Sequence, residues 1–322
     1  MSKYVAIAIT LMLLMALPIL SLPYANAKVA SLSAPVHNGY PMLPAPPTPL
    51  TPPGPAVPFP GLKASRNVCP NHNNTECTGS FNWGGYAVNA TPNLLLHGVS
   101  QVNGSWTVPS LTGVNTAGGN GTTGSPCGGD ASWYDVAVWI GIDGFSTGTV
   151  EQTGTASDCY YGTTFYYAWF EFYPAPSITV FNVNPGDKIS AGVHYDSTHN
   201  RFTTVITDVT LKLTNSSKPT HVNKAEEGSA EWIIESAAAC LNPSCSFLTL
   251  LDLSDFTPVT FTGATASIGT FVNAPISSFG ENVFNILMIN LNYPFTPGIK
   301  ATTGALAKSG NKFTSDWVGA GP

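Results

Sequence analysis

The sequence predicts an all-β fold, a sandwich or a barrel, for this chain of 322 residues. Short stretches rich in β-branched and aromatic residues recur along it, and Gly, Asn, Pro and Ser separate them. Several stretches alternate between polar and apolar residues, which is the pattern of a half-buried strand. No alternation of strands with helices is visible, so we expect many short strands joined by turns.

The individual elements follow from the same pattern. In chain order, the predicted strands cover residues 83–88, 101–108, 132–142, 163–173, 178–183, 188–195, 203–213 and 259–261. The window 225–241 is rich in Ala and Glu, and residue propensity alone predicts that part of it is helical.

The beginning of the chain predicts export. Lys3 precedes an apolar run at 5–17, and Ala25-Asn26-Ala27 forms a cleavage site, so residues 1–27 are typical of a signal peptide. An uncleaved membrane anchor is the alternative, since the apolar segment is about long enough to span a bilayer. No later segment is long and apolar enough to do so, and we expect no stable membrane insertion after cleavage.

Residues 28–66 form a second segment, in which ten prolines fall between positions 41 and 60. Such a run favours extended polyproline II structure. We interpret 28–66 as a pro-segment that makes the protein a zymogen, or as a stalk that attaches it to the cell surface. Residues 67–322 are then the folded domain of a secreted, extracellular protein, which we expect to be a monomer.

Composition limits the function further. Only 9% of residues are charged, against about 25% in ordinary domains, while 43% are apolar. Residues 67–187 contain no Lys or Arg but eight Asp or Glu residues. Nucleic-acid binding depends on Lys and Arg, so we exclude it. Few charges also mean few ion pairs to lose on protonation, which suggests an acidic habitat.

The cysteines favour disulfides over a metal site. An even number of cysteines in an exported chain is typical of disulfides, here Cys69, Cys77, Cys127, Cys159, Cys240 and Cys245. The simplest pairing joins the first two and the last two, leaving Cys127 with Cys159. No C-x-x-C pair supports zinc. His194 and His199 flank Asp196, but a polar hairpin loop explains them better, so we predict no metal and no cofactor.

Residues 144–148 match G-x-S-x-G, the nucleophile turn of serine hydrolases. That turn requires a helix after it, whereas the residues that follow are typical of a strand. We therefore interpret 144–148 as a turn between two strands.

Two strand faces carry candidate functional groups. Trp139, Gly141 and Asp143 share one face, which fits a substrate-binding surface and the edge of a core equally well. Glu231 and Glu235 share a face if 231–235 is a strand. Two carboxylates on one face can perform acid/base chemistry, although a solvated edge explains the pattern as simply.

At these positions the sequence resembles the glutamic peptidases, also called eqolisins (peptidase family G1). Six short pieces occur in the family's order over about residues 80 to 320, namely Asn82-Trp83-Gly84-Gly85, Trp106-Thr107-Val108-Pro109, Trp139-Ile140-Gly141-Ile142-Asp143-Gly144, Glu151-Gln152-Thr153-Gly154, Ala168-Trp169-Phe170-Glu171-Phe172-Tyr173-Pro174 and Ala230-Glu231-Trp232-Ile233-Ile234-Glu235.

The resemblance implies an antiparallel β-sandwich of lectin-like, jelly-roll type, with residues 229–235 in a strand. It implies an acid endopeptidase acting on polypeptides, with Gln152 and Glu231 as the catalytic pair. It also implies that Trp139, Asp143 and Glu171 lie beside that pair and contact substrate.

The chemistry fits these residue types. A carboxylate such as Glu231 takes a proton from water and passes it to the leaving nitrogen, while the amide of Gln152 donates a hydrogen bond to the oxyanion. Three alternatives remain open: a jelly-roll lectin that binds sugars without hydrolysis, a glycosidase that pairs Glu231 with Asp143 or Glu235, and a non-catalytic surface protein on a stalk.

Overall fold

A computed structural model describes residues 76–90, 98–113, 133–145, 147–160, 163–240, 248–290 and 298–320, together with three two-residue strands near the beginning. The predicted signal peptide, 1–27, lies outside the described residues. The contacts divide the chain into Met1–Pro44 and Ala45–Pro322. Within the first unit, β1 (Val36–His37) pairs with β2 (Tyr40–Pro41).

The described part of the second unit consists of strands and one short 3₁₀-helix, η1 (Ile276–Asn282). The strands are β3 (Ala56–Val57), β4 (Glu76–Ser80), β5 (Trp83–Asn89), β6 (Val99–Thr107), β7 (Leu111–Gly113), β8 (Trp133–Ile142), β9 (Val150–Tyr160), β10 (Thr163–Tyr173), β11 (Ile178–Asn182), β12 (Lys188–Asp196), β13 (Arg201–Asp208), β14 (Leu213–Ser216), β15 (Ser229–Glu235), β16 (Ala238–Cys240), β17 (Leu248–Leu250), β18 (Asp252–Leu253), β19 (Asp255–Phe256), β20 (Val259–Ile268), β21 (Phe271–Pro275), β22 (Val283–Ile289), β23 (Ile299–Thr303) and β24 (Phe313–Trp317).

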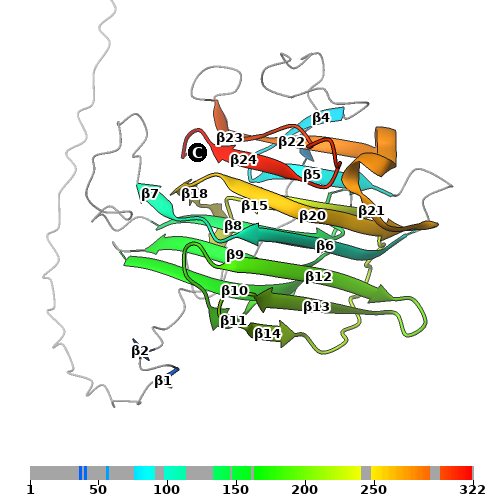
Figure 1. The fold of residues 1–322 in the computed structure, drawn as a ribbon, viewed down its shortest axis with the longest axis horizontal. Coiled ribbons are helices and arrows are strands. Elements are labelled where there is room, and N and C mark those ends of the chain that lie inside the picture. The colour runs from blue at the N-terminus through cyan, green and yellow to red at the C-terminus, as the bar shows by residue number, and fades with distance from the viewer. Residues whose placement is uncertain are drawn as a thin grey trace, which may run out of the picture. The chain divides into compact units, whose positions relative to one another are not determined.

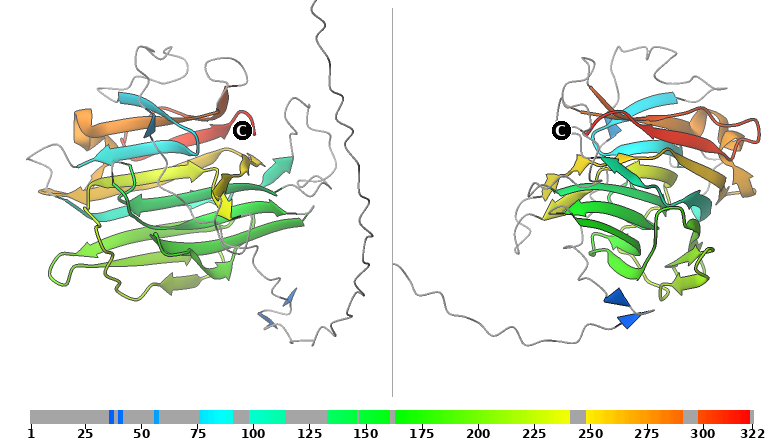
Figure 2. Two further views of the ribbon diagram at one scale, coloured as in Figure 1. Left: turned by 180° about the vertical axis from the view of Figure 1, so that it is seen from behind. Right: turned by 60° about the vertical axis from the view of Figure 1, so that its left-hand side comes forward.

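Two antiparallel sheets organise these strands (Figure 1). The first has the order β11-β10-β9-β8-β15-β5-β22, and the second has the order β14-β13-β12-β6-β20. The first part of β20 pairs with β24 and the rest with β6, while β23 joins β24 to β22. The sheets are therefore nearly closed on each other, and the predicted all-β antiparallel fold is confirmed (Figure 2).

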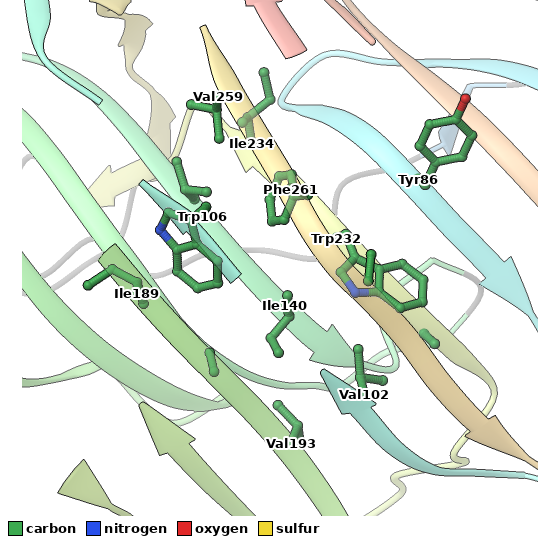
Figure 3. Close-up of a cluster of buried hydrophobic side chains, with 14 of the residues drawn as sticks. Tyr86, Val102, Trp106, Ile140, Ile189, Val193, Trp232, Ile234, Val259 and Phe261 are labelled. Carbon is green, nitrogen blue, oxygen red and sulfur yellow. The ribbon is translucent and has the colours of Figure 1, made fainter. Parts of the chain in front are cut away.

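The main core contains large side chains from facing strands (Figure 3). Trp106, Ile140, Trp232 and Phe261 are all nearly or fully buried in it. The buried indole N–H of Trp232 donates to the backbone oxygen of Asn103 at 2.7 Å. Because side chains alternate along a strand, placing Trp232 in this core turns its neighbours on β15 to the opposite face of the sheet.

Most predicted strands are confirmed within one to three residues at each end. Two predictions differ more. The stretch 259–261 is the beginning of a longer strand, β20, which continues to Ile268, and 203–213 contains two strands, β13 and β14, joined by a turn. The carboxylate of Asp208 accepts the backbone N–H of Leu211 at 2.8 Å, and Lys212 has a φ of 59°. An Asp that closes a tight turn through its own side chain therefore interrupts a pattern that looks like one continuous strand.

The helix predicted within 225–241 is wrong, and the strand that the resemblance implied at 229–235 is confirmed as β15. All seven residues of β15 are buried, and the strand pairs with β5 on one side and β8 on the other. Pairing and burial on both sides outweigh the helix propensity of Ala and Glu.

Three further predictions concern smaller features. β8 ends at Ile142 and β9 begins at Val150, so the G-x-S-x-G match lies between two strands, as predicted. Cys77 and Cys159 are disulfide-bonded, whereas Cys69, Cys127, Cys240 and Cys245 have no described side chains, so the pairing stays a prediction. Within the described ranges, no helix has the length and apolar character needed to span a membrane.

Candidate active site

A single row of paired residues crosses the first sheet and brings the predicted catalytic residues together. Glu231 on β15 lies opposite Gly141 on β8, Gly141 lies opposite Gln152 on β9, and Gln152 lies opposite Glu171 on β10. Directly paired residues of antiparallel strands point to the same face. Neighbouring strands are about 4.8 Å apart, so the backbones of Glu231 and Gln152 are about 10 Å apart, with only a glycine between them.

The glycine in this row allows the side chains of Trp139 and Gln152 to pack closely over its backbone. A Cβ atom on Gly141 would lie 3.0 Å from Cζ3 of Trp139 and 3.3 Å from Cβ of Gln152. Gly141 and the ring of Trp139 therefore form the floor between Glu231 and Gln152.

Glu171 fixes the orientation of the Gln152 amide. The Nε2 atom of Gln152 donates to Oε2 of Glu171 at 2.6 Å, and both side chains are fully buried. A glutamine amide has two N–H donors, so one remains after this bond. The Oε1 atom of Gln152 has no hydrogen-bond partner among the described residues. One donor and one acceptor thus remain available beside Gly141.

Glu231 is fully buried, and neither of its carboxylate oxygens has a hydrogen-bond partner in the described part of the chain. Burial is the main reason that its pKa lies well above the ordinary value, and the charge of Asp143 raises it further. The nearby Ser229 hydroxyl and Phe145 backbone act in the opposite direction. Burial therefore favours the protonated form of Glu231, and contact with water would lower this pKa because it restores solvation of the charge.

Asp143 is engaged with backbone rather than with Gln152 or Glu231. Its carboxylate accepts the backbone N–H groups of Glu226, Glu227 and Gly228 at 3.0, 3.0 and 2.7 Å. Its own backbone N–H donates to the oxygen of Ser229 at 3.0 Å. Asp143 therefore holds the segment that leads into β15, directly before Glu231, and its predicted contact with substrate stays a prediction.

Trp139 is fully buried, which favours the core-edge interpretation of its pattern. Its ring packs edge-on against Trp83 at a centroid distance of 5.0 Å. Its indole Nε1 donates to Oε2 of Glu235 at 2.7 Å, and Asn82 Nδ2 donates to the other oxygen of Glu235 at 2.9 Å. The sequence indicated Glu235 only as a possible second carboxylate of a glycosidase, and its bond to Trp139 was not predicted.

Two other groups of buried acids were not anticipated. Burial and the neighbouring charge of Asp143 raise the pKa of Glu151 to about 10. Burial likewise raises the pKa of Asp158 to about 7, and that of Asp135 well above its ordinary value. Asp158 accepts the hydroxyl of Tyr167 at 2.9 Å. The only sequence signal for these acids was their position within strands of apolar and aromatic residues.

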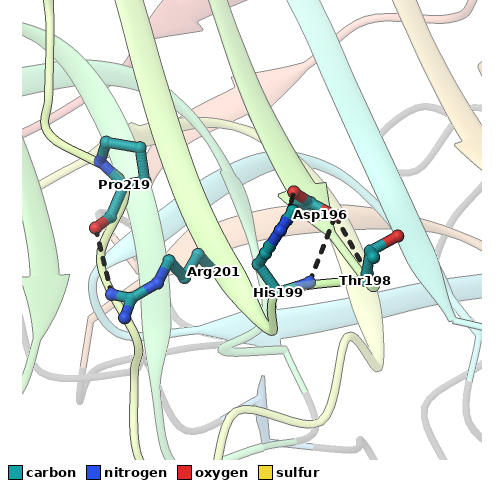
Figure 4. A network of polar contacts seen from close by, with 5 residues as sticks. All are labelled: Asp196, Thr198, His199, Arg201 and Pro219. Carbon is teal, nitrogen blue, oxygen red and sulfur yellow. Dashed lines mark hydrogen bonds and ion pairs between the residues drawn. The ribbon is translucent and has the colours of Figure 1, made fainter.

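Of the histidines considered as metal ligands, His194 lies on β12, and His199 lies in the turn between β12 and β13 (Figure 4). Asp196 accepts the backbone N–H groups of Thr198 and His199 and lies 2.6 Å from the His199 ring nitrogen Nδ1, at an exposed turn. This is the polar hairpin expected from the sequence. Throughout the described ranges, no cluster of three or more His, Cys, Asp or Glu side chains is arranged to hold a metal ion.

Comparison with known proteins gives a consistent set of relatives. Residues 81–290 match the family described as Peptidase A4. The chain is 33% identical to aspergillopepsin-2 of Aspergillus niger over 208 residues, which cover 59% of this chain and 65% of that protein. It is 28% identical to scytalidopepsin B of Scytalidium lignicola over 229 residues, which cover 69% of this chain and 73% of that protein.

Solved structures show the same fold. A scytalido-glutamic peptidase with a transition state analog inhibitor matches with a TM-score of 0.55 and 21% identity, over 74% of this chain and 98% of that one. An eqolisin-family peptidase in a complex with the tripeptide Ala-Ile-His matches with a TM-score of 0.51 and 20% identity, over the same shares of the two chains.

Proposed function

This chain belongs to the peptidase A4 family, the glutamic peptidases or eqolisins, and on that premise we propose that it is an acid endopeptidase with Glu231 and Gln152 as its catalytic pair. The observation that supports this most is the row Glu231–Gly141–Gln152–Glu171, in which a carboxylate and an amide face each other across a glycine.

The unused hydrogen-bonding capacity of the pair suggests how the reaction proceeds. Glu231, as carboxylate, takes a proton from a water molecule held between it and Oε1 of Gln152. The water oxygen attacks the peptide carbonyl carbon, and the remaining N–H of Gln152 donates to the developing oxyanion. Glu231 then gives the proton to the leaving nitrogen, which breaks the C–N bond and regenerates the carboxylate.

Glu171 and Asp143 support the pair without taking part in proton transfer. Glu171 occupies one N–H of Gln152, so the amide cannot rotate to turn its oxygen toward the oxyanion. Asp143 anchors residues 226–228, which fixes where β15 begins and hence where Glu231 lies. Holding reacting groups within a few tenths of an ångström of the productive arrangement is a large part of catalysis.

Glu231 and Gln152 are fully buried, so a peptide must displace a neighbouring segment to reach them, and the turn between β8 and β9 lies next to Glu231. The backbone of Phe145 in this turn lies near the Glu231 carboxylate. The ring of Phe145 packs on the ring of Phe284, with a distance of 4.8 Å between the ring centroids. Phe284 is paired with Ala87, the residue opposite Glu231 on β5. The turn therefore covers the β5 side of Glu231.

The hydrogen bonds of Trp139 and Glu235 argue against two of the alternatives, a lectin that uses Trp139 and a glycosidase that uses Glu235. A lectin site would need an exposed ring, whereas Trp139 has no exposed surface and its N–H is bonded to Glu235. A glycosidase that paired Glu231 with Glu235 would need a free second carboxylate, whereas both oxygens of Glu235 accept hydrogen bonds.

The remaining parts of the proposal concern maturation and location. We propose that residues 1–27 direct secretion, that 28–66 are removed as a pro-segment, and that the six cysteines form three disulfides. The mature N-terminus then lies between about residues 60 and 70. An N-terminus at Lys28 in the active protein would contradict the pro-segment and favour a stalk.

Proteolysis of a denatured protein tests the proposed activity. We expect the purified protein to cleave it at about pH 2 to 5. The Gln152→Ala variant should be at least about 100-fold slower, which is the cost of removing one oxyanion donor. If the wild type leaves the denatured protein intact over this range but binds glycans, the lectin alternative replaces the proposal.

A further inference from the structure

Three of the sequence pieces that resemble the family meet in one buried hydrogen-bonded group outside the catalytic row. Asn82 comes from the first piece, Trp139 from the third and Glu235 from the last. Glu235 accepts Asn82 Nδ2 at 2.9 Å on one oxygen and Trp139 Nε1 at 2.7 Å on the other. Glu235, which accepts one hydrogen bond on each carboxylate oxygen, therefore links β15 to β8 and to the residue directly before β5.

The orientation of Asn82 is set independently of Glu235. The Ser80 hydroxyl donates to Oδ1 of Asn82 at 3.1 Å, and the backbone oxygen of Asn82 accepts the N–H of Ser236 at 2.9 Å. The Asn82 amide nitrogen is thus directed at Glu235, and Glu235 is held from one side before it contacts Trp139.

Trp139 connects this group to the reacting atoms. Its six-membered ring abuts Gly141, the residue between Glu231 and Gln152, so that even a Cβ atom there would come within 3.0 Å of Cζ3. A Cβ atom on Gly154 would come within 2.9 Å of the Trp139 backbone, so the base of the side chain is fixed as well. The hydrogen bond from the indole Nε1–H to Glu235 then fixes the rotation of the ring about the side-chain bonds of Trp139.

We propose that Glu235 is a positioning residue for the peptidase reaction, because it locks the ring of Trp139 that forms the floor between Glu231 and Gln152. This inference rests on the proposed function. Glu235 itself contacts neither member of the catalytic pair among the described hydrogen bonds, and it acts only through Trp139. Releasing the ring shifts the floor, and a displacement of about 1 Å costs on the order of 100-fold in rate.

The test compares two variants that differ in whether an acceptor remains. In Glu235→Gln, the amide oxygen still accepts the Trp139 N–H, so the bond that holds the ring is kept even though the bond to Asn82 is lost. In Glu235→Leu, of similar volume, no acceptor remains and both donors are left unpaired.

For Glu235→Leu we expect kcat on a peptide substrate to fall about 10- to 100-fold, with KM within about threefold of the wild type. Glu235→Gln should keep kcat within about threefold. The matched control is Asp158→Asn, which changes another fully buried acid on the same sheet, keeps an acceptor for Tyr167, and should leave kcat unchanged. Wild-type kcat in folded Glu235→Leu, or an equal loss in Glu235→Gln, overturns the proposal.

A second readout does not depend on activity. The proton resonance of the Trp139 indole N–H, identified by its disappearance in Trp139→Phe, should move upfield in Glu235→Leu and stay in place in Glu235→Gln. An unchanged resonance in Glu235→Leu overturns the proposal even if activity falls. If the wild type cleaves no peptide, the proposed function fails, and this resonance still decides whether Glu235 fixes Trp139.

Discussion

The buried carboxylic acids predict an unusual dependence of stability on pH. The pKa values of Asp135, Glu151, Asp158, Glu231 and Glu235 all lie above their ordinary values, with burial as the first cause in every case. These acids are therefore protonated in the folded chain over a pH range in which the unfolded chain has already released the protons. Raising the pH from about 4 to 7 should lower the free energy of unfolding.

The direction follows from proton binding. Between the unfolded and the folded pKa of a buried acid, the folded state binds more protons, so stability falls as pH rises. The stability is fully present below the ordinary pKa near 4 and is lost as the pH passes the raised value. Lys300, whose pKa burial lowers to about 8, adds no slope in this window, because it is protonated in both states below that pH.

The pKa shift of Asp158 gives the size of the expected change in the free energy of unfolding. Its pKa rises from 3.8 to about 7. Three pKa units correspond to about 4 kcal/mol at neutral pH, a large part of the roughly 5–15 kcal/mol of a typical protein. Because the five acids interact, their contributions do not add, but their signs agree.

Urea unfolding across this range measures the effect, in a Gln152→Ala background that prevents self-cleavage. We expect the free energy of unfolding to be greatest near pH 4 and to fall by several kcal/mol at about pH 7. Asp158→Asn should reduce the slope, because it keeps the acceptor for Tyr167 and removes the titration. The exposed control Glu281→Gln should not change it. Stability that is flat or rises between these pH values refutes the reasoning.

The remaining predictions concern individual residues of the site. Asp143→Ala removes the acceptor of three backbone N–H groups and should lower the free energy of unfolding by about 3 kcal/mol, together with kcat; an unchanged melting temperature would contradict this. Gly141→Val places side-chain atoms against Trp139 and Gln152 and should reduce kcat at least about 100-fold in a folded protein; a full-rate variant would show that the floor is elsewhere. Dialysis against EDTA should leave cleavage unchanged, since the reaction proposed here uses only Glu231 and Gln152; loss of activity would return attention to the histidines.

The β-class of the fold could be predicted from the sequence because most strands keep their alternating pattern and end at turn residues. β10 covers the predicted 163–173, and β8 and β11 each differ from prediction by one residue. The pattern failed where a side chain closes a turn, as Asp208 does after β13, and where pairing on both sides outweighs propensity, as in β15.

The residues of the site were identifiable only in part. Short motifs located Gln152, Glu171 and Glu231, and strand parity placed Trp139 with Gly141. Register between distant strands is not visible in a single sequence, so the row that joins these residues could not be derived. The same limit concealed the bond from Trp139 to Glu235, 96 residues away in the chain.

The low charge of the chain also has a sharper explanation. The sequence suggested tolerance of acid because few ion pairs are present to be lost. Among the described residues the only ion pair is the exposed contact between His199 and Asp196. Five acids, Asp135, Glu151, Asp158, Glu231 and Glu235, are instead buried with raised pKa values, so we expect the fold to be most stable in acid, where they are neutral.

The most direct test of the central claim is kcat/KM for one peptide substrate, measured for the wild type and for Glu231→Gln at the same acidic pH. Gln has the shape of Glu but cannot accept and return a proton. We predict a folded variant, by circular dichroism, with a loss of at least about 100-fold, the lower range for a missing general base. Full activity in folded Glu231→Gln would contradict the account.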